Sequence, residues 1–400
     1  MHFSLNGDHH KKYLVFGLII LGIVLRIPFT TLDPIFNVIA HSLNVPISSL
    51  GFLTTVPLIM FAICSFIIPS IAQKFELKSI FTYSLILMTL GSFIRLFNIV
   101  GLYIGTAFIG IAIAFLNVLL PAAVTEYFPN DVGKYTSVYV SAMTLSMTLC
   151  NSVVVPITNW LSWKGTIIIL SFIILISLIY WFPSLKMKNL NMNMNNINVN
   201  NDSEFISIKK IWTNKRAWIL LIFSGLQSFI FYVFLTWLPT IMIEYGVSPS
   251  TAGIISGIYS LIGLPFSIFL PAMVVKMKKN IRKIMLMFLC ILLVLGSIML
   301  FYKTSNLCYW CIIVLFLGCP LGALYPYEMT IFSEKASSSK ASASITGMAQ
   351  TGGYILAAIG PVVFGYCFNV NHLFAIILVT IIGIMMSISL WMIEKYKVIL

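Results

Sequence analysis

The sequence predicts an all-α membrane protein with twelve transmembrane helices in two parallel six-helix repeats. Three observations support this fold class: an apolar composition, twelve long apolar segments, and residues that recur at a constant spacing between the two halves. Hydrophobic residues make up 60% of the 400 residues and charged residues only 9%. This composition excludes a soluble globular domain, because such domains carry about 25% charged residues.

Each apolar segment is long enough to cross a bilayer as a helix. The segments are 13–35, 49–72, 79–97, 102–125, 133–157 and 163–183 in the first half, and 217–242, 251–275, 281–301, 307–331, 342–367 and 371–393 in the second. We therefore predict six-helix bundles over 13–183 and 217–394. The polar, asparagine-rich segment 184–216 is predicted to be a flexible linker, and 1–12 and 395–400 are predicted to be short tails.

Residues of the first half recur in the second half. The matching pairs share a spacing of about 200 residues: Gly51 with Gly253, Pro69 with Pro271, Lys74 with Lys276, Pro121 with Pro326 and Met143 with Met348. A common spacing of half the chain length indicates that one half repeats the other. Parallel repeats of six helices place a substrate site near the middle of the bilayer, between the halves.

The positively charged residues are distributed unevenly. Except for Lys164, Lys303, Arg26 and Arg95, every lysine and arginine lies in or next to a tail or an alternate connection between the predicted helices. This asymmetry follows the positive-inside rule and predicts a multi-pass protein of the plasma membrane with both termini in the cytoplasm. The net charge of +13 therefore reflects topology and contact with the lipid bilayer, and no nucleic-acid partner is expected.

Catalytic and metal-binding patterns are missing from the sequence. It contains no HExxH or GxSxG pattern, no cluster of histidines with carboxylates, and no complete phosphate loop around Gly133. Cys308 and Cys311 form a CxxC pair without a second pair of ligands, so packing is the favoured interpretation. We therefore expect that the protein is not an enzyme and that it binds neither a metal ion nor a cofactor. Transport of a solute against its concentration gradient would have to be driven by an ion gradient or by exchange for another solute.

Arg26 interrupts the first apolar segment, LIILGIVLRIPFTTLDP (18–34). An arginine at the centre of a membrane helix costs about 2.5–3.5 kcal/mol, and it usually faces a bundle interior or a water-filled cavity. Helical spacing puts Arg26, Thr30, Asp33 and Asn37 on one stripe. We favour substrate binding for Arg26 and Thr30. The alternatives are an arginine that snorkels to the headgroups or a structural ion pair.

Five further residues inside the segments are candidates for a substrate cavity: Asn117, Gln227, Trp237, Gln350 and Tyr354. Gln350 and Tyr354 share one helix face, because they are four residues apart. The alternative for each of the five is packing between helices, through an amide hydrogen bond or an aromatic stripe. The sequence does not separate the two interpretations.

Glu328 and Arg95 are candidates for coupling to an ion such as the proton. Glu328 is the only carboxylate within the predicted tenth segment, and Arg95 lies near the end of the third. Ionisable residues inside membrane segments commonly belong to ion pathways. For Glu328, simple placement at the membrane interface fits the sequence equally well. For Arg95, snorkelling to the outer headgroups is the favoured interpretation.

Several motifs resemble one family of known proteins. They are LRIP (25–28), GFLTTVPLIMF (51–61), NVLLP (117–121), TWLPTIMIEYGVSPSTAG (236–253) and GMAQTGGYILAAIGP (347–361). In this order and spacing they are similar to the major facilitator superfamily, and within it to the cyanate/2-nitroimidazole transporter branch. The resemblance implies that helices 1, 4, 7 and 10 line a central cavity. One departure is the loop IAQKFELKS (71–79), which lacks the aspartate usual in the superfamily.

The sequence thus predicts a monomeric secondary active transporter that moves a small-molecule substrate by alternating access, by symport or antiport. The favoured substrate is a small anion such as cyanate, or a compact organic metabolite. Arg26 would bind it, because a guanidinium holds small planar anions in a bidentate way. The alternatives are an exporter of neutral or drug-like compounds such as nitroimidazoles and, less favoured, a channel or membrane sensor. Protons are a candidate coupling ion.

Overall fold

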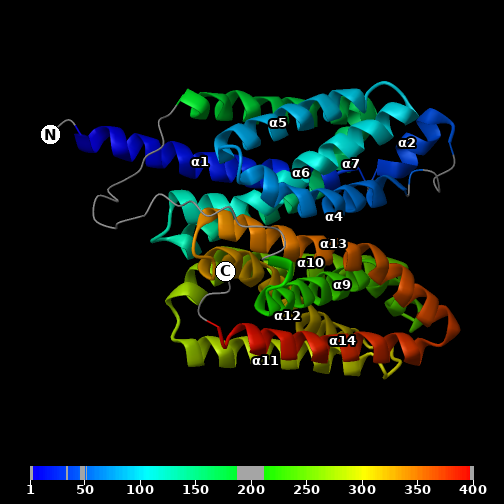
Figure 1. Ribbon diagram of the computed structural model, residues 1–400. Helices are drawn as coiled ribbons and strands as arrows, with labels where there is room; N and C mark the ends of the chain where they lie inside the picture. Colours follow the sequence, from blue (N-terminus) through cyan, green and yellow to red (C-terminus); the bar gives the residue numbers. More distant parts are fainter. Residues whose placement is uncertain (1–2, 33–34, 46–49, 51, 187–210, 397–400) are drawn as a thin grey trace.

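The computed structural model describes residues 3–396 except 33–34, 46–49, 51 and 187–210, so most of the predicted linker lies outside the described residues. Within this part of the chain every regular element is a helix (Figure 1), which confirms the all-α fold class. The helices are α1 (Phe3–Thr30), α2 (Phe36–Leu43), α4 (Phe52–Ala72), α5 (Leu77–Ile94), α6 (Ile99–Tyr127), α7 (Val132–Trp181), η2 (Phe182–Lys186), α9 (Lys215–Glu244), α10 (Pro249–Lys276), α11 (Lys279–Met299), α12 (Leu307–Glu334), α13 (Ser339–Val370) and α14 (His372–Ile393).

Eleven helices in the described part are long and apolar enough to cross a membrane. α7 accounts for two of the twelve predicted spans, because its 50 residues contain a backbone break at Ser162, with φ 66° and ψ 168°. Both ends of α7 lie on the side of the molecule that holds the N- and C-termini. At its start Gly133 packs against Pro271, and at its end the Trp181 indole donates to the Lys78 carbonyl. The chain therefore reverses direction at Ser162, between the predicted fifth and sixth spans.

The first helix differs from its predicted range of 13–35. α1 begins within the predicted tail and ends at Thr30. A helix rarely continues through the residue that precedes a proline, and Pro34 follows closely. Asn37 lies in a separate helix, α2, so the predicted continuation of the polar stripe from Thr30 to Asn37 is wrong. Asp33 lies outside the described residues.

The short helix α2 was not predicted, and it packs on the first bundle at the side opposite the chain termini. Ile39 of α2 joins a buried apolar cluster that also contains Leu53 and Trp163. The Trp163 indole donates a hydrogen bond to Ser42 Oγ at 2.8 Å. The connection after the first span is therefore held against α7 rather than extended away from the bundle.

The long helices form two bundles that lie side by side (Figure 1). α1, α4, α5, α6 and α7 pack together in the first bundle, and α9 to α14 pack together in the second. Between the bundles, α4 contacts α13 and α7 contacts α10. Under the sequence repeat, α4 corresponds to α10 and the first part of α7 corresponds to α13. The α4–α13 contact and the α7–α10 contact are therefore two copies of one contact, as parallel repeats require.

Glycines allow this close approach of the bundles. A Cβ atom added at Gly347 in α13 would lie 2.3 Å from Pro69 Cγ in α4. A Cβ atom added at Gly133 in α7 would lie 2.4 Å from the Pro271 carbonyl oxygen in α10. Pro69 and Pro271 are one of the pairs that indicated the repeat. The same repeat position thus packs against the opposite bundle in both halves.

Serine hydroxyls also join the bundles toward the side of the chain termini. Three of them donate across the interface: Ser333 to the Pro121 carbonyl at 2.8 Å, Ser339 to Glu126 Oε2 at 3.0 Å, and Ser141 to the Ser267 carbonyl at 2.9 Å. A hydrogen bond contributes only about 0.5–1.5 kcal/mol net. The bundles are therefore closed at this side by contacts that are individually weak and can separate.

The contact of Gly347 with α4 gives a test of this interface. We predict that Gly347→Ala lowers the midpoint of thermal unfolding in detergent, because the added methyl group overpacks the helix crossing by about 1–3 kcal/mol. Gly257→Ala in α10 is the matched control, since a Cβ atom there meets nothing within 4 Å. The control should be neutral or slightly stabilising. Equal midpoints for the two variants would contradict the close packing described for α4 and α13.

Candidate functional site

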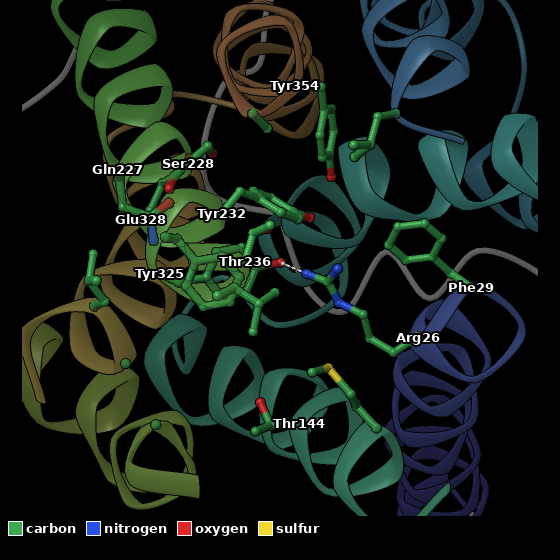
Figure 2. A pocket seen from close by; sticks show the side chains of 18 of the residues that line it. Arg26, Phe29, Thr144, Gln227, Ser228, Tyr232, Thr236, Tyr325, Glu328 and Tyr354 are labelled. Atoms are coloured by element: carbon green, nitrogen blue, oxygen red, sulfur yellow. Dashed lines mark hydrogen bonds between the residues drawn. The ribbon is translucent and has the colours of Figure 1, made fainter. Parts of the chain in front are cut away.

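A cavity of about 490 Å³ lies between the two bundles (Figure 2). Its walls come from α1, α4, α7, α9, α10, α12 and α13, and its volume lies in the range of small-molecule sites. Five of the residues singled out from the sequence line it: Arg26, Gln227, Glu328, Gln350 and Tyr354. The structure therefore brings together, from both repeats, most of the polar residues that interrupt the apolar segments.

Arg26 extends from α1 across the cavity toward the second bundle (Figure 2). Its Nη2 atom donates to the Tyr325 hydroxyl at 3.4 Å, and its Cζ lies 5.8 Å from the centre of the Tyr325 ring. A hydrogen bond of this length is weak. The guanidinium is directed into the cavity and away from the lipid headgroups. The guanidinium thus presents charged, coplanar N–H donors to a ligand in the cavity.

Glu328 lies on the wall opposite Arg26, beside Gln227 (Figure 2). Both side chains are buried, with 2% of each residue exposed. The Ser224 hydroxyl donates to Glu328 Oε1 at 2.5 Å, and α12 places Glu328 one turn after Tyr325. A cation and a carboxylate therefore face each other across the cavity, each in contact with a neutral hydroxyl group.

α13 contributes the third polar wall through Gln350 and Tyr354. The Asn117 side chain does not line the cavity; its Nδ2 donates to the Tyr354 hydroxyl at 2.9 Å. The ring of Tyr354 also packs against Phe61, with ring centres 4.7 Å apart. Asn117 on α6 therefore fixes the position of Tyr354 from behind, and this hydrogen bond connects the two bundles.

Trp237 also lies outside the cavity lining. Its indole donates to the Pro361 carbonyl at 2.9 Å, and its ring packs against Phe364 and Phe368. Both the hydrogen bond and the ring contacts of Trp237 are therefore made to α13, which supports the packing interpretation for this residue. The side chain of Thr30, another predicted binding residue, lies outside the described residues.

Arg95 is buried inside the first bundle, with 2% of the residue exposed, and does not reach the headgroups. Its Nη1 donates to the Pro28 carbonyl at 2.7 Å and its Nε to Thr106 Oγ1 at 3.0 Å. A Cβ atom at Gly105 would lie 2.8 Å from Arg95 Cγ, so a glycine makes room for the side chain. Arg95 therefore holds the last turn of α1, two residues beyond Arg26.

The sequence analysis missed the tyrosines and hydroxyls of the second bundle that line the cavity. Ser228, Tyr232 and Thr236 do so from α9, and their spacing of four residues was the available signal. Tyr259 on α10 also lines the cavity, and its buried hydroxyl has no hydrogen-bond partner within the described part of the chain. A buried polar group without a partner is unfavourable, so this hydroxyl is available to a ligand.

Comparison with known proteins identifies the family to which this chain belongs. Residues 18–361 match the family model of the Major Facilitator Superfamily. The chain belongs to this superfamily. The match covers most of the chain, and it confirms the superfamily that the sequence motifs resemble.

Two curated relatives align over nearly their full length. One is the uncharacterized transporter YycB of Bacillus subtilis (strain 168), which is 29% identical over 94% of this chain and 92% of the relative. The other is the 2-nitroimidazole transporter of Escherichia coli (strain K12), which is 29% identical over 96% of each chain. This second match agrees with the branch of the superfamily indicated by the motifs.

A solved structure of the same fold is that of the proton:xylose symporter XylE bound to 6-bromo-6-deoxy-D-glucose. It superimposes with a TM-score of 0.76 at 15% sequence identity, over 96% of this chain and 95% of the other. The superfamily fold with twelve helices is thereby confirmed. The protein is a multi-pass membrane transporter.

The contact of Arg95 with α1 gives a prediction for this site. Arg95→Leu removes the donor from the buried Pro28 carbonyl, which should lower stability by about 1–3 kcal/mol and weaken substrate binding by loosening Arg26. Arg95→Lys should recover part of both losses. The control is Arg216→Leu, because Arg216 is exposed and surface charges contribute little. Thermal midpoints and uptake KM in proteoliposomes measure the effects; identical values for Arg95→Leu and Arg216→Leu would contradict this role.

Proposed function

We propose that the protein is a secondary active transporter of a small, planar solute that carries a negatively charged or strongly electronegative group. In this proposal Arg26 binds that group, and the bundles over 13–183 and 217–394 rock about the cavity in alternating access. The single observation that carries the proposal is the guanidinium of Arg26 inside a cavity of about 490 Å³ shared by both bundles. One chain supplies the whole cavity, so a monomer is sufficient.

The membrane and orientation follow from the charge pattern. The lysines and arginines gather in and next to the tails and alternate connections, and the positive-inside rule places such segments in the cytoplasm. We therefore place the protein in the plasma membrane with both termini inside the cell. The bundles are in contact toward that side through Gly347 and Gly133, so the structure corresponds to a transporter closed toward the cytoplasm.

The shape of the cavity favours a flat ligand. Phe29, Tyr232 and Tyr354 surround the guanidinium (Figure 2), and aromatic faces stack well on planar groups. A guanidinium pairs with two oxygens or nitrogens in one plane. The unpartnered hydroxyl of Tyr259 adds a further hydrogen-bonding position. A compact carboxylate fits this paired geometry, and cyanate, which is linear, would place one terminal atom against the guanidinium.

The test of the proposal is solute counterflow in proteoliposomes with labelled cyanate and a panel of small carboxylates. Arg26→Ala should reduce the apparent affinity about 100-fold, because two charge-assisted hydrogen bonds are lost. Arg26→Lys keeps the charge without the bidentate geometry and should lie between. Arg216→Ala, on the exposed surface, is the control. Unchanged counterflow in Arg26→Ala would remove this residue from the substrate site.

A second candidate function is export of neutral nitro-substituted azoles. Two observations favour it: the aromatic lining of the cavity and the similarity to a 2-nitroimidazole transporter. For a neutral ligand, stacking contributes more than charge. Arg26→Lys should then leave counterflow of 2-nitroimidazole nearly unchanged, whereas Tyr232→Ala should weaken it. The reverse pattern favours the anion.

We further propose that Glu328 carries the coupling proton. It is the only carboxylate among the described residues that line the cavity, and buried carboxylates inside membrane bundles commonly act in proton relays. Glu328→Gln should abolish accumulation driven by a pH gradient but preserve exchange of labelled for unlabelled solute. Glu244→Gln, at the far end of α9, is the control. Full gradient-driven accumulation in Glu328→Gln would exclude this role.

A further inference from the structure

A second hollow lies on the outside of the second bundle, between α11 and α14. These helices pack side by side (Figure 1) and enclose a groove of about 520 Å³ that is almost entirely apolar. Its lining residues are Met287, Cys290, Ile291, Val294 and Leu295 of α11, and Ile384, Ser387, Ile388 and Trp391 of α14. None of them lines the central cavity. The groove is therefore separate from the transport site.

The groove has the length of part of a lipid acyl chain. It runs along α11 from Met287 to Leu295, which at 1.5 Å per residue is about 12 Å. Half of the hydrocarbon core of a bilayer is about 15 Å thick. Ile291 and Ile388 are about half exposed, so the groove is open along its side to the surrounding membrane. Most of one extended acyl chain of one leaflet therefore fits this space.

Two lysines stand at the end of the groove nearest the chain termini. The Lys395 ammonium lies 3.5 Å and the Lys283 ammonium 4.6 Å from the centre of the Trp391 ring. Trp391 itself lines the groove. Tryptophan is enriched at the level of the lipid headgroups, where its ring is part apolar and part wet. The polar end of the groove therefore coincides with a pair of positive charges.

The nearby carboxylates are bound to other groups. Glu394 receives hydrogen bonds from Arg282 at 2.8 Å and from the Tyr327 hydroxyl at 2.5 Å. Glu334 pairs with the same arginine. Within the described residues neither Lys283 nor Lys395 forms an ion pair with an acidic side chain. Two ammonium groups near one aromatic ring repel each other, and an anion bound beside them offsets this repulsion.

We propose that this groove is a binding site for an anionic phospholipid. One acyl chain lies between α11 and α14, and the phosphate binds Lys283 and Lys395 beside Trp391. The charge of the site selects this occupant. A symmetric contact with a second copy of the chain would bring the same lysines together from both copies, which is unfavourable. A zwitterionic lipid carries no net charge to neutralise the pair.

Native mass spectrometry of the full-length protein, titrated with phosphatidylglycerol or phosphatidylcholine, tests the proposal. The protein should retain one phosphatidylglycerol more strongly than phosphatidylcholine. Lys283→Gln/Lys395→Gln should weaken that binding about 30-fold, the effect of removing two charges from a headgroup site. Lys74→Gln/Lys134→Gln is the matched control, because it removes two exposed lysines of the first bundle and should leave the binding unchanged.

A third variant separates the acyl chain from the headgroup. Ser387→Phe fills the groove and should weaken phosphatidylglycerol binding, while leaving any binding of soluble glycerol phosphate unaltered. Three results would each overturn the proposal: equal losses in the groove and control pairs, equal retention of the two lipids, or undiminished binding in Ser387→Phe. Circular dichroism and the thermal midpoint confirm that each variant folds. Because the groove is remote from the cavity, solute counterflow in a neutral-lipid vesicle should be unchanged in all of them.

Discussion

The charge of Arg26 has to be kept inside an apolar bundle, and much of the central architecture depends on this requirement. An arginine at the centre of a membrane helix costs about 2.5–3.5 kcal/mol when lipid surrounds it. The two bundles replace the lipid with a cavity, and the hydroxyl oxygen of Tyr325 in the second bundle accepts a hydrogen bond from the guanidinium. A second buried arginine, Arg95, binds the Pro28 carbonyl and fixes the end of α1. Arg26 is thus positioned by contacts from both halves.

The contacts between the bundles differ in kind from those within the second bundle. Between bundles, glycines and serine hydroxyls predominate, as at Gly347 and Ser333, and such contacts separate without exposing a buried charge. Within the second bundle, Arg282 joins Glu334 and Glu394 near the chain termini. Burial lowers the pKa of the Lys335 amine beside this cluster. Removing one member of such a cluster is strongly unfavourable, so these ion pairs hold the ends of α11, α12 and α14 together.

This division has a consequence for how the membrane acts on the protein. The outer face of the second bundle carries the groove between α11 and α14, with Lys283 and Lys395 at its end. A lipid held there contacts only the second bundle. The proposed lipid site and the proposed substrate site share no lining residue, although each has positive charge at an apolar space.

The sequence by itself determined the helical class, the repeat and the presence of a charge, Arg26, within the first span, because periodicity, composition and single charged residues are local properties of the chain. It located Gln350 and Tyr354 on one face of a helix, and the structure places both in the cavity. Tertiary structure alone decided which amides and aromatic rings face the cavity: Asn117 supports Tyr354 from behind, and Trp237 binds the Pro361 carbonyl. A helical spacing fixes which residues share a face, but only the packing of the neighbouring helices fixes what that face meets.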